Sequence, residues 1–168
     1  MRAKIICVLA ICLVSSALIA QEVSVNYNHH QNFAQNRTNA WGTVNQNRIA
    51  NSILAQEAQH DVNAALQSKG LQMVQQDQNP DLIVVMGGGA KEQTSYSDWT
   101  TQGADAGLGE ITPEQNVEGT LVVNLYDTKT KSLVWRGIAE KTLEKSGEKN
   151  LKIVTNAVDK MFKQWPKQ

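Results

Sequence analysis

The alternation of apolar and polar residues predicts a set of β-strands. Residues 23–27 and 119–126 alternate apolar and polar side chains, which is typical of half-buried strands. Residues 133–143 form a further strand after a short polar turn, and with 119–126 they make the clearest hairpin of the chain. Residues 82–86 are continuously apolar, which favours a central strand, and residues 71–74 are compatible with a short strand.

Two other segments have the spacing of amphipathic helices. The first, residues 48–69, ends before Gly70, a residue type that commonly follows a helix C-terminus. The second follows Ser146-Gly147 and runs to Trp165, where Pro166 ends it. The two predicted apolar stripes consist of Ile49, Ile53, Leu54, Ala58, Val62, Ala65 and Leu66, and of Leu151, Val154, Val158, Met161, Phe162 and Trp165.

The order of these elements predicts the fold class. Two helices that each bury one apolar stripe need a common apolar surface, and an antiparallel sheet supplies it. We therefore predict an α+β fold, a two-layer sandwich with two helices on one face of a mainly antiparallel sheet, as a single domain over residues 21–168. Residues 87–116 are predicted to be a long loop, which is either a pair of strand extensions ending in a loop or the site of function.

The first twenty residues have the pattern of an export signal. A short basic start precedes an apolar run over residues 5–19, which is shorter than the about 20 residues of a membrane-spanning helix. We predict a signal peptide over residues 1–20, cleaved after Ala20, with no membrane span after its removal. Cleavage after Ala17 and an uncleaved anchor remain as alternatives.

Both cysteines, Cys7 and Cys12, lie inside this apolar run. A lipoprotein cysteine would follow the run directly and be preceded by a small residue. Cys12 instead follows Ile11 and the run continues beyond it, which argues against lipid anchoring. The exported chain then has no cysteine, which excludes disulfides, thiol catalysis and thiolate metal ligands.

The charge balance excludes two function classes. The chain has 16 Lys+Arg and 16 Asp+Glu residues, and 41% of its residues are hydrophobic. A near-neutral body excludes a polybasic nucleic-acid binder, whose affinity rests on clustered cations. The hydrophobic content excludes wholesale disorder.

Several short motifs occur along the chain in a fixed order. They are Val23-Ser24-Val25-Asn26-Tyr27, Asn32-Phe33, Ala40-Trp41, Asn79-Pro80-Asp81-Leu82-Ile83-Val84, Gly119-Thr120-Leu121-Val122-Val123, Leu133-Val134-Trp135-Arg136-Gly137 and Met161-Phe162-Lys163-Gln164-Trp165-Pro166. With these motifs the chain resembles the domain-of-unknown-function 4136 family, whose members are mostly described as bacterial envelope lipoproteins without an established activity or catalytic residues. Without a usable lipidation cysteine, the resemblance implies a periplasmic or secreted form here.

The residues of these motifs are interpreted as structural. Trp135 lies on the core face of the hairpin, together with Leu133. Arg136 then points to solvent or to the sheet edge, where it can pair with a carboxylate, and Gly137 marks a bulge or close packing by a neighbour. Asp81 is a turn residue rather than a general base. The residues assigned to structure are Trp41, Asp81, Gly119, Trp135, Arg136 and Gly137.

The sequence predicts no metal site and no cofactor. His29 and His30 are adjacent, so on a strand they would point to opposite faces, and His60 lies in a helix without a His-Glu-x-x-His pattern. Gly87-Gly88-Gly89 follows an apolar strand, but no Gly-Lys-Ser/Thr follows, so we interpret the three glycines as a place where the strand twists or bulges.

No catalytic constellation is apparent, and the predicted function is a non-enzymatic binding or structural module of the cell envelope. Tyr96 and Trp99 lie in the predicted loop, where they are expected to contact a sugar face or a partner protein, either an envelope protein or a second copy of the chain. The alternative is that they fold back on the sheet. The alternative function is a small periplasmic hydrolase. It would use loop carboxylates such as Asp98 and Asp105, or Ser95 with a histidine.

Overall fold

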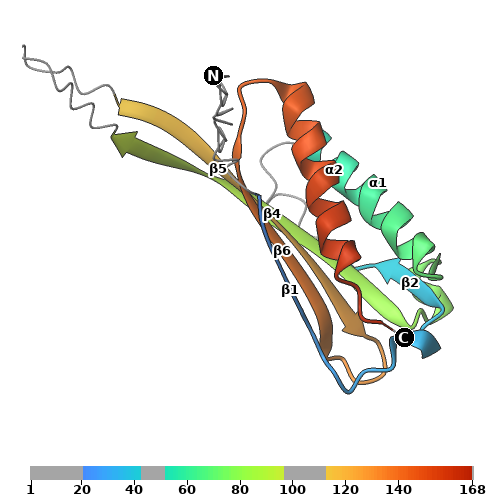
Figure 1. The fold of residues 1–168 in the computed structure, drawn as a ribbon. Coiled ribbons are helices and arrows are strands. Elements are labelled where there is room, and N and C mark those ends of the chain that lie inside the picture. The colour runs from blue at the N-terminus through green and yellow to red at the C-terminus, as the bar shows by residue number, and fades with distance from the viewer. Residues whose placement is uncertain (1–20, 43–51, 97–112, 168) are drawn as a thin grey trace, which may run out of the picture.

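The chain folds into a six-stranded sheet with two helices (Figure 1). The computed structural model describes residues 21–42, 52–96 and 113–167, so the predicted signal peptide and both cysteines lie outside the described residues. In spatial order the strands are β1 (Glu22–Tyr27), β6 (Leu133–Leu143), β5 (Pro113–Asp127), β4 (Leu82–Tyr96), β2 (Thr38–Trp41) and β3 (Gln72–Met73).

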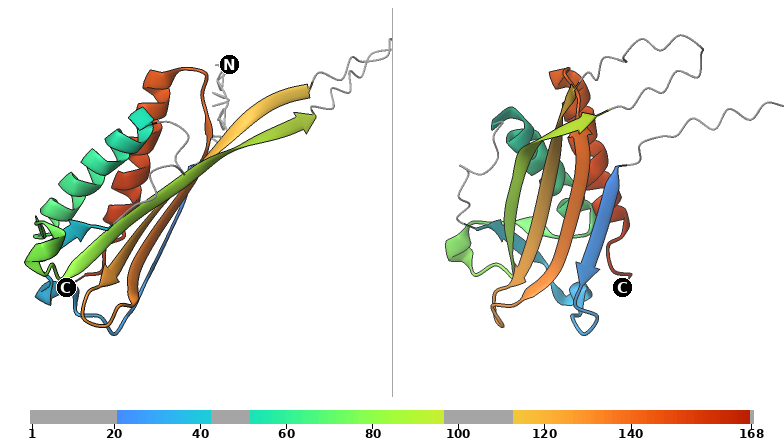
Figure 2. Two further views of the ribbon diagram at one scale, coloured as in Figure 1. Left: turned by 180° about the vertical axis from the view of Figure 1, so that it is seen from behind. Right: turned by 90° about the vertical axis from the view of Figure 1, so that its left-hand side faces the viewer.

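The sheet is mainly antiparallel, as predicted. The pairs β1–β6, β6–β5 and β5–β4 are antiparallel. β2 runs parallel to both β4 and β3. The helices are α1 (Ser52–Ser68) and α2 (Gly147–Lys163), and short 3-10 turns lie at Phe33–Gln35 and Gln76–Gln78. Both helices lie on the same side of the sheet (Figure 2), which confirms the two-layer α+β fold.

Trp135 is at the centre of the core. Its side chain is fully buried, its ring stacks on Phe162 with centroids 5.0 Å apart, and the ring of Trp165 lies 5.7 Å away. Phe162 belongs to α2 and Trp165 to the segment just after it, so this cluster joins the helical layer to the sheet. Trp165 packs here although α2 ends at Lys163, two residues earlier than predicted.

The apolar stripe of α1 is narrower than predicted. Ala58, Val62 and Leu66 are buried, but Ile53 is 64% exposed. At about 100° per residue, Ile53 lies on the side of the helix away from Val62 and Leu66. Its predicted core position is therefore wrong.

Both helices have well-formed ends. Gly70 adopts a φ of 86°, which lets the backbone N–H of Leu71 donate to the carbonyl oxygen of Leu66 and close α1. At the start of α2, the side chain of Ser146 accepts from the backbone N–H of Lys149. The predicted role of Gly70 at the end of the first helix is confirmed, and the N-cap role of Ser146 is a finding of the structure.

A bulge in β6 changes which residues face the core. Leu125 pairs with Trp135, whereas the next residue of β5, Tyr126, pairs with Leu133. Val134 is therefore an extra residue in the ladder, and both Val134 and Trp135 are buried. The bulge turns the side chain of Leu133 away from the core, and 38% of Leu133 is exposed. Its predicted place on the core face beside Trp135 is therefore wrong.

The predicted loop over residues 87–116 is wrong in its extent. β4 continues to Tyr96 and β5 begins at Pro113, and the two strands pair along their whole length. Strand extension is therefore the interpretation that the structure supports for the segments on either side of 97–112, which lie outside the described residues. The polar sequence hid these strands because their pairing, rather than an apolar face, holds them together.

The extended strands form a projecting arm. The pairing of β5 with β6 ends at Val117 and Leu143, and beyond this point β4 and β5 pair only with each other among the described residues. We define the arm as residues 93–96 and 113–116. Figure 1 shows this end of β4 and β5 leaving the body of the sheet.

Candidate functional site

The residues predicted to contact a partner lie at the end of the arm or beyond it. Tyr96 is the last residue of β4 and pairs with Pro113, the first residue of β5. Trp99 lies outside the described residues. The structure therefore places the backbone of Tyr96 away from the helices and the core.

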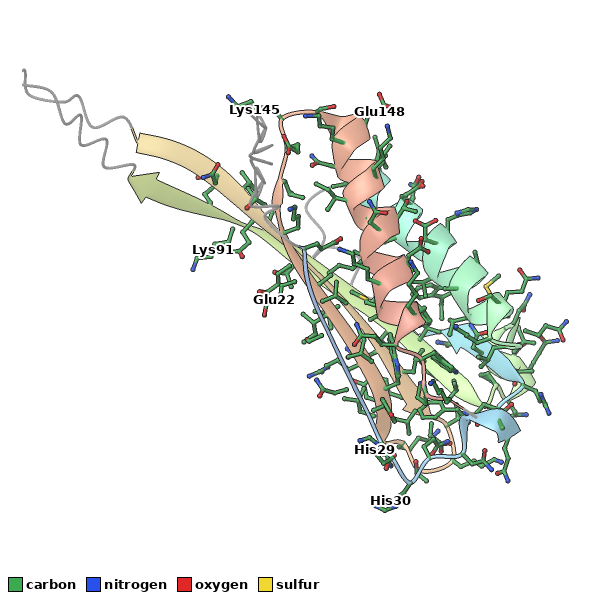
Figure 3. The ribbon with its side chains drawn as sticks, viewed as in Figure 1. Glu22, His29, His30, Lys91, Lys145 and Glu148 are labelled. Atoms are coloured by element: carbon green, nitrogen blue, oxygen red, sulfur yellow. The ribbon has the colours of Figure 1, made fainter. Side chains whose placement is uncertain are left out.

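The described part of the chain does not bring Ser95 together with a histidine. Ser95 lies in the arm, whereas His29 and His30 follow β1 at the opposite end of the sheet (Figure 3). Tyr27 lies level with Val84 across the paired strands, and at about 3.3 Å per residue the distance along β4 from Val84 to Ser95 is roughly 36 Å. The side chain of His60 on α1 is 79% exposed, and its Nδ1 lies 3.3 Å from Oδ1 of Asp61. The other loop residues named for hydrolysis, Asp98 and Asp105, lie outside the described residues.

His29 and His30 lie in a turn rather than on a strand, so the prediction that they face opposite sides of a strand does not apply. The backbone N–H of His30 donates to Oδ1 of Asn28 at 2.9 Å, and the ring of His29 lies 4.5 Å from that of Tyr27. Both histidines line a hollow of about 440 Å³. Within the described ranges, no group of three or more His, Cys, Asp or Glu side chains is placed to hold a metal ion.

Asp81 joins the start of β4 to the start of β2. Its Oδ2 accepts from the backbone N–H of Arg37 at 2.8 Å and from the N–H and hydroxyl of Thr38 at 3.0 and 3.1 Å. These donors, the Arg37 N–H foremost, hold the pKa of Asp81 below its ordinary value of 3.8. A similar set of donors from Thr130 lowers the pKa of Asp127 in the β5–β6 turn. Such carboxylates act as structural acceptors rather than as bases.

Arg136 and Trp41 each bond a side-chain amide. Nε of Arg136 donates to Oδ1 of Asn124 at 2.7 Å, directly across the β5–β6 pair. The predicted pairing of Arg136 with a carboxylate is therefore wrong. Nε1 of Trp41 donates to Oδ1 of Asn63 at 2.9 Å, which links β2 to α1.

Gly137 and Gly119 are sites of close packing. A Cβ atom built on Gly137 would lie 2.7 Å from the ring of Trp135 and 2.8 Å from Sδ of Met161. A Cβ atom on Gly119 would lie 2.9 Å from the side chain of Leu143. Of the two interpretations of Gly137, the structure supports close packing by neighbours.

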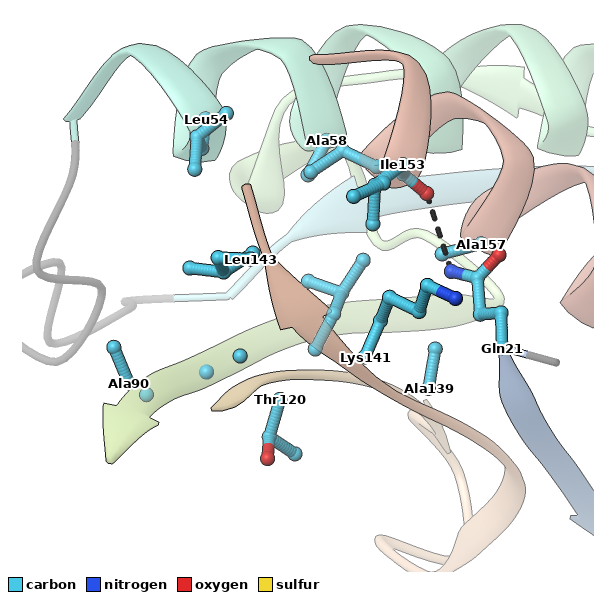
Figure 4. Close-up of a pocket in the computed structure, with 15 residues that line it drawn as sticks. Gln21, Leu54, Ala58, Ala90, Thr120, Ala139, Lys141, Leu143, Ile153 and Ala157 are labelled. Atoms are coloured by element: carbon cyan, nitrogen blue, oxygen red, sulfur yellow. Dashed lines mark hydrogen bonds between the residues drawn. The ribbon is translucent and has the colours of Figure 1, made fainter. Parts of the chain in front are cut away.

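A pocket that the sequence did not reveal lies between the helices and the sheet (Figure 4). Small residues from four elements contribute to its lining, namely Gly88 of β4, Ala139 of β6, Ala58 of α1 and Ala157 of α2. Because these side chains end short of one another, a cavity of about 90 Å³ remains. The pocket is open to solvent on one side, where the lining residues Gly89 and Ala90 are exposed.

The pocket, which we call the interlayer pocket, is aliphatic with a polar edge. Leu54, Leu143 and Ile153 supply its larger walls, and the described lining residues include no aromatic side chain. At one edge, Nε2 of Gln21 donates to the carbonyl oxygen of Ile153 at 3.1 Å. Lys141 extends toward this edge from the core-facing side of β6 (Figure 4), and it is the one charged residue among the described lining residues.

The fold and these contacts define a small α+β module stabilised by an aromatic core and side-chain clamps. The family model described as a domain of unknown function, DUF4136, matches residues 23–167. The chain therefore belongs to the DUF4136 family, which confirms the resemblance seen in its motifs. A comparison with curated proteins finds no match.

Solved structures share this fold at low sequence identity. A DUF4136 family protein from Bacteroides thetaiotaomicron is 15% identical, with a TM-score of 0.55 over 86% of this chain and 95% of that one. A PDZ domain protein from Parabacteroides distasonis is 17% identical, with a TM-score of 0.58 over 87% of this chain. The chain spans 35% of the length of that protein. The PelC dodecamer from Paraburkholderia phytofirmans is 14% identical, with a TM-score of 0.50 over 82% of this chain and 95% of that one.

Neither helix in the described part of the chain is long and apolar enough to cross a membrane.

Proposed function

We propose that the protein is an exported, non-enzymatic module of the bacterial cell envelope, periplasmic or secreted, that binds an envelope protein through the β4–β5 arm. The observation that carries the proposal is the projection of the arm beyond the rest of the sheet. Its backbone is fixed by the pairing of Tyr96 with Pro113, although nothing from β6 supports it there. A strand pair that is ordered before binding loses less entropy when a partner docks.

The residues at the end of the arm suit a protein contact. Tyr96 ends β4, and Trp99 follows three residues later in the sequence. Tyr and Trp are enriched among the residues that dominate binding energy at protein interfaces. The arm itself carries Gln, Thr and Ser on one strand and Glu, Gln and Asn on the other, side chains that favour a polar rim around such anchors.

The hydrolase alternative receives less support. Its serine form requires a histidine beside Ser95, but His29 and His30 lie at the opposite end of the sheet from the arm (Figure 3), and the side chain of His60 on α1 is 79% exposed. The two carboxylates with a lowered pKa, Asp81 and Asp127, are held by backbone donors and so have little basicity.

Self-association is a second form of the same proposal. A structural neighbour, PelC, is described as a dodecamer. In the described part of this chain, the edge strand β1 pairs with β6 alone, so its other edge is open to a strand from a second copy. The β1 edge and the arm are at different places on the sheet, so one experiment can distinguish them.

The experiment is a cross-linking pull-down from envelope extract, followed by mass spectrometry. The test variant lacks residues 93–116 and joins Glu92 to Val117, which are paired in the wild type, through an Asn-Gly turn. The control variant is His30→Ala, an exposed substitution at the other end of the sheet. We expect a partner that the wild type and His30→Ala capture and the shortened variant does not. Equal capture by the shortened variant, with unchanged melting, refutes the arm as the binding element.

A further inference from the structure

We propose that the interlayer pocket binds the end of a saturated aliphatic chain that carries an anionic group, such as the acyl chain of a fatty acid or an anionic lipid. This site is separate from the arm: none of residues 93–96 and 113–116 is among the described lining residues. The proposal therefore goes beyond the partner contact and does not depend on it.

The shape of the pocket selects for a narrow ligand. Its lining combines small side chains, such as Ala58, Ala139 and Ala157, with the aliphatic walls of Leu54 and Ile153. The cavity of about 90 Å³ is smaller than the roughly 150 Å³ that accommodates benzene in an engineered protein cavity. A few methylene groups fit this space, and the rest of the chain extends out of the pocket.

The chemistry of the lining disfavours other common ligands. Sugars and nucleobases are bound by aromatic faces together with several convergent hydrogen-bonding groups. The described lining has no aromatic ring, and the side-chain amide of Gln21 already donates to Ile153. Apolar contact is therefore the main interaction that the interior of the pocket offers.

Lys141 is the reason for inferring that the ligand carries an anionic group. A lysine on the core-facing side of a strand is unusual, because Lys is rarely placed toward an apolar interior. Its side chain contributes to the lining and extends toward the edge of the pocket that Gln21 forms (Figure 4). A carboxylate or phosphate at the outer end of an acyl chain meets a positive charge there.

The test measures binding of the purified protein to hexanoate, octanoate and decanoate by ligand-observed NMR and calorimetry. Each methylene that enters the pocket tightens binding by about fourfold, equivalent to ~0.8 kcal/mol, until the pocket is full. Octanol, which has the same chain as octanoate without the charge, binds about threefold more weakly, and Lys141→Gln removes this difference. Absence of saturable binding by all three acids overturns the proposal.

Matched substitutions locate the site. Ala139→Leu places a larger side chain in the pocket and weakens octanoate binding by at least about tenfold. Ala90→Leu, at an exposed lining position, repeats the test where folding is not at risk. The control, Ala64→Leu, makes the same change at an exposed position of α1 outside the described lining and leaves binding unchanged. Equal binding by the two pocket variants and the control overturns the assignment.

A parallel measurement separates the two sources of such a chain. Vesicles of phosphatidylcholine with phosphatidylglycerol are sedimented with the wild type and with Ala90→Leu. Sedimentation of the wild type alone identifies a membrane lipid as the source, whereas octanoate binding without sedimentation identifies a free acid. The variant that lacks the arm retains octanoate binding in either case, so failure of the partner proposal and failure of this one are distinguishable.

Discussion

Gly137→Ala tests how tightly the core is packed at the joint between sheet and helices. The added Cβ would lie 2.7 Å from the far end of the Trp135 ring and 2.8 Å from Sδ of Met161. Met161 can move aside at low cost because its side chain is flexible. The ring of Trp135 is rigid and is stacked between the sheet and Phe162, so it cannot move without disturbing the aromatic cluster.

The expected magnitude combines two opposing effects. Replacing a glycine in extended backbone with alanine restricts the unfolded chain and stabilises by about 0.4–1 kcal/mol where the side chain fits. Overpacking a close-packed core costs about 1–3 kcal/mol. The net result for Gly137→Ala is a loss of about 1–2 kcal/mol, or roughly 2–8 °C in melting temperature for a domain of this size.

The assay is urea unfolding followed by tryptophan fluorescence, with Gly87→Ala as the matched control. A Cβ atom on Gly87, also in a strand, meets no atom within 4 Å, so this variant gains stability by about 0.5 kcal/mol. Trp135→Phe removes the atom that the new methyl group would strike. The loss in free energy of unfolding caused by Trp135→Phe should therefore be smaller in the Gly137→Ala background than in the wild type, by about 1 kcal/mol. Equal stabilisation by both alanine variants would refute the packing argument.

Three further predictions concern the core, the hydrogen bonds of Asp81 and the arm. Trp135→Ala loses about 3–5 kcal/mol in urea unfolding because the indole is fully buried, and a loss below about 1 kcal/mol contradicts its place in the core. Asp81→Ala leaves the three donors of Arg37 and Thr38 without their acceptor and loses about 2 kcal/mol at pH 7. Because the pKa of Asp81 is lowered on folding, its contribution is complete above about pH 5 and is lost as the pH falls through the folded-state pKa. The difference between wild type and Asp81→Ala in acid unfolding should shrink below about pH 4, and a constant difference contradicts the charge effect. The arm-shortened chain lacks none of the buried core residues and melts within about 3 °C of the wild type, and loss of a cooperative transition shows that the arm supports the fold.

Periodicity predicted the elements whose faces differ in polarity. The strand at residues 23–27, the 119–126 and 133–143 hairpin and both helices appear where the pattern placed them, because each has one face on the core. β2 was missed in the amide-rich stretch. Asn39 in this strand is buried although it is polar, so no alternation marks it.

The arm and the bulge show the limits of the same argument. In the arm, both strands are polar, so their pairing leaves no trace in the periodicity. At the bulge, Val134 interrupts the alternation of β6 and moves Leu133 to the other face, and only the pairing with Tyr126 reveals the shift.

The interlayer pocket depends on residues that are distant in the sequence, and each of them has an ordinary local explanation. Gly88 belongs to a run of glycines that was interpreted as a twist or bulge of the strand. Ala58 and Ala157 lie in helices, where alanine is a common residue. The cavity exists because small residues meet at one level between the two layers. Because the pocket opens to solvent beside the exposed Ala90, its apolar lining stays accessible to water in the free protein. An acyl chain that enters this space removes the apolar lining from water, and its anionic group accounts for Lys141 on the core-facing side of β6.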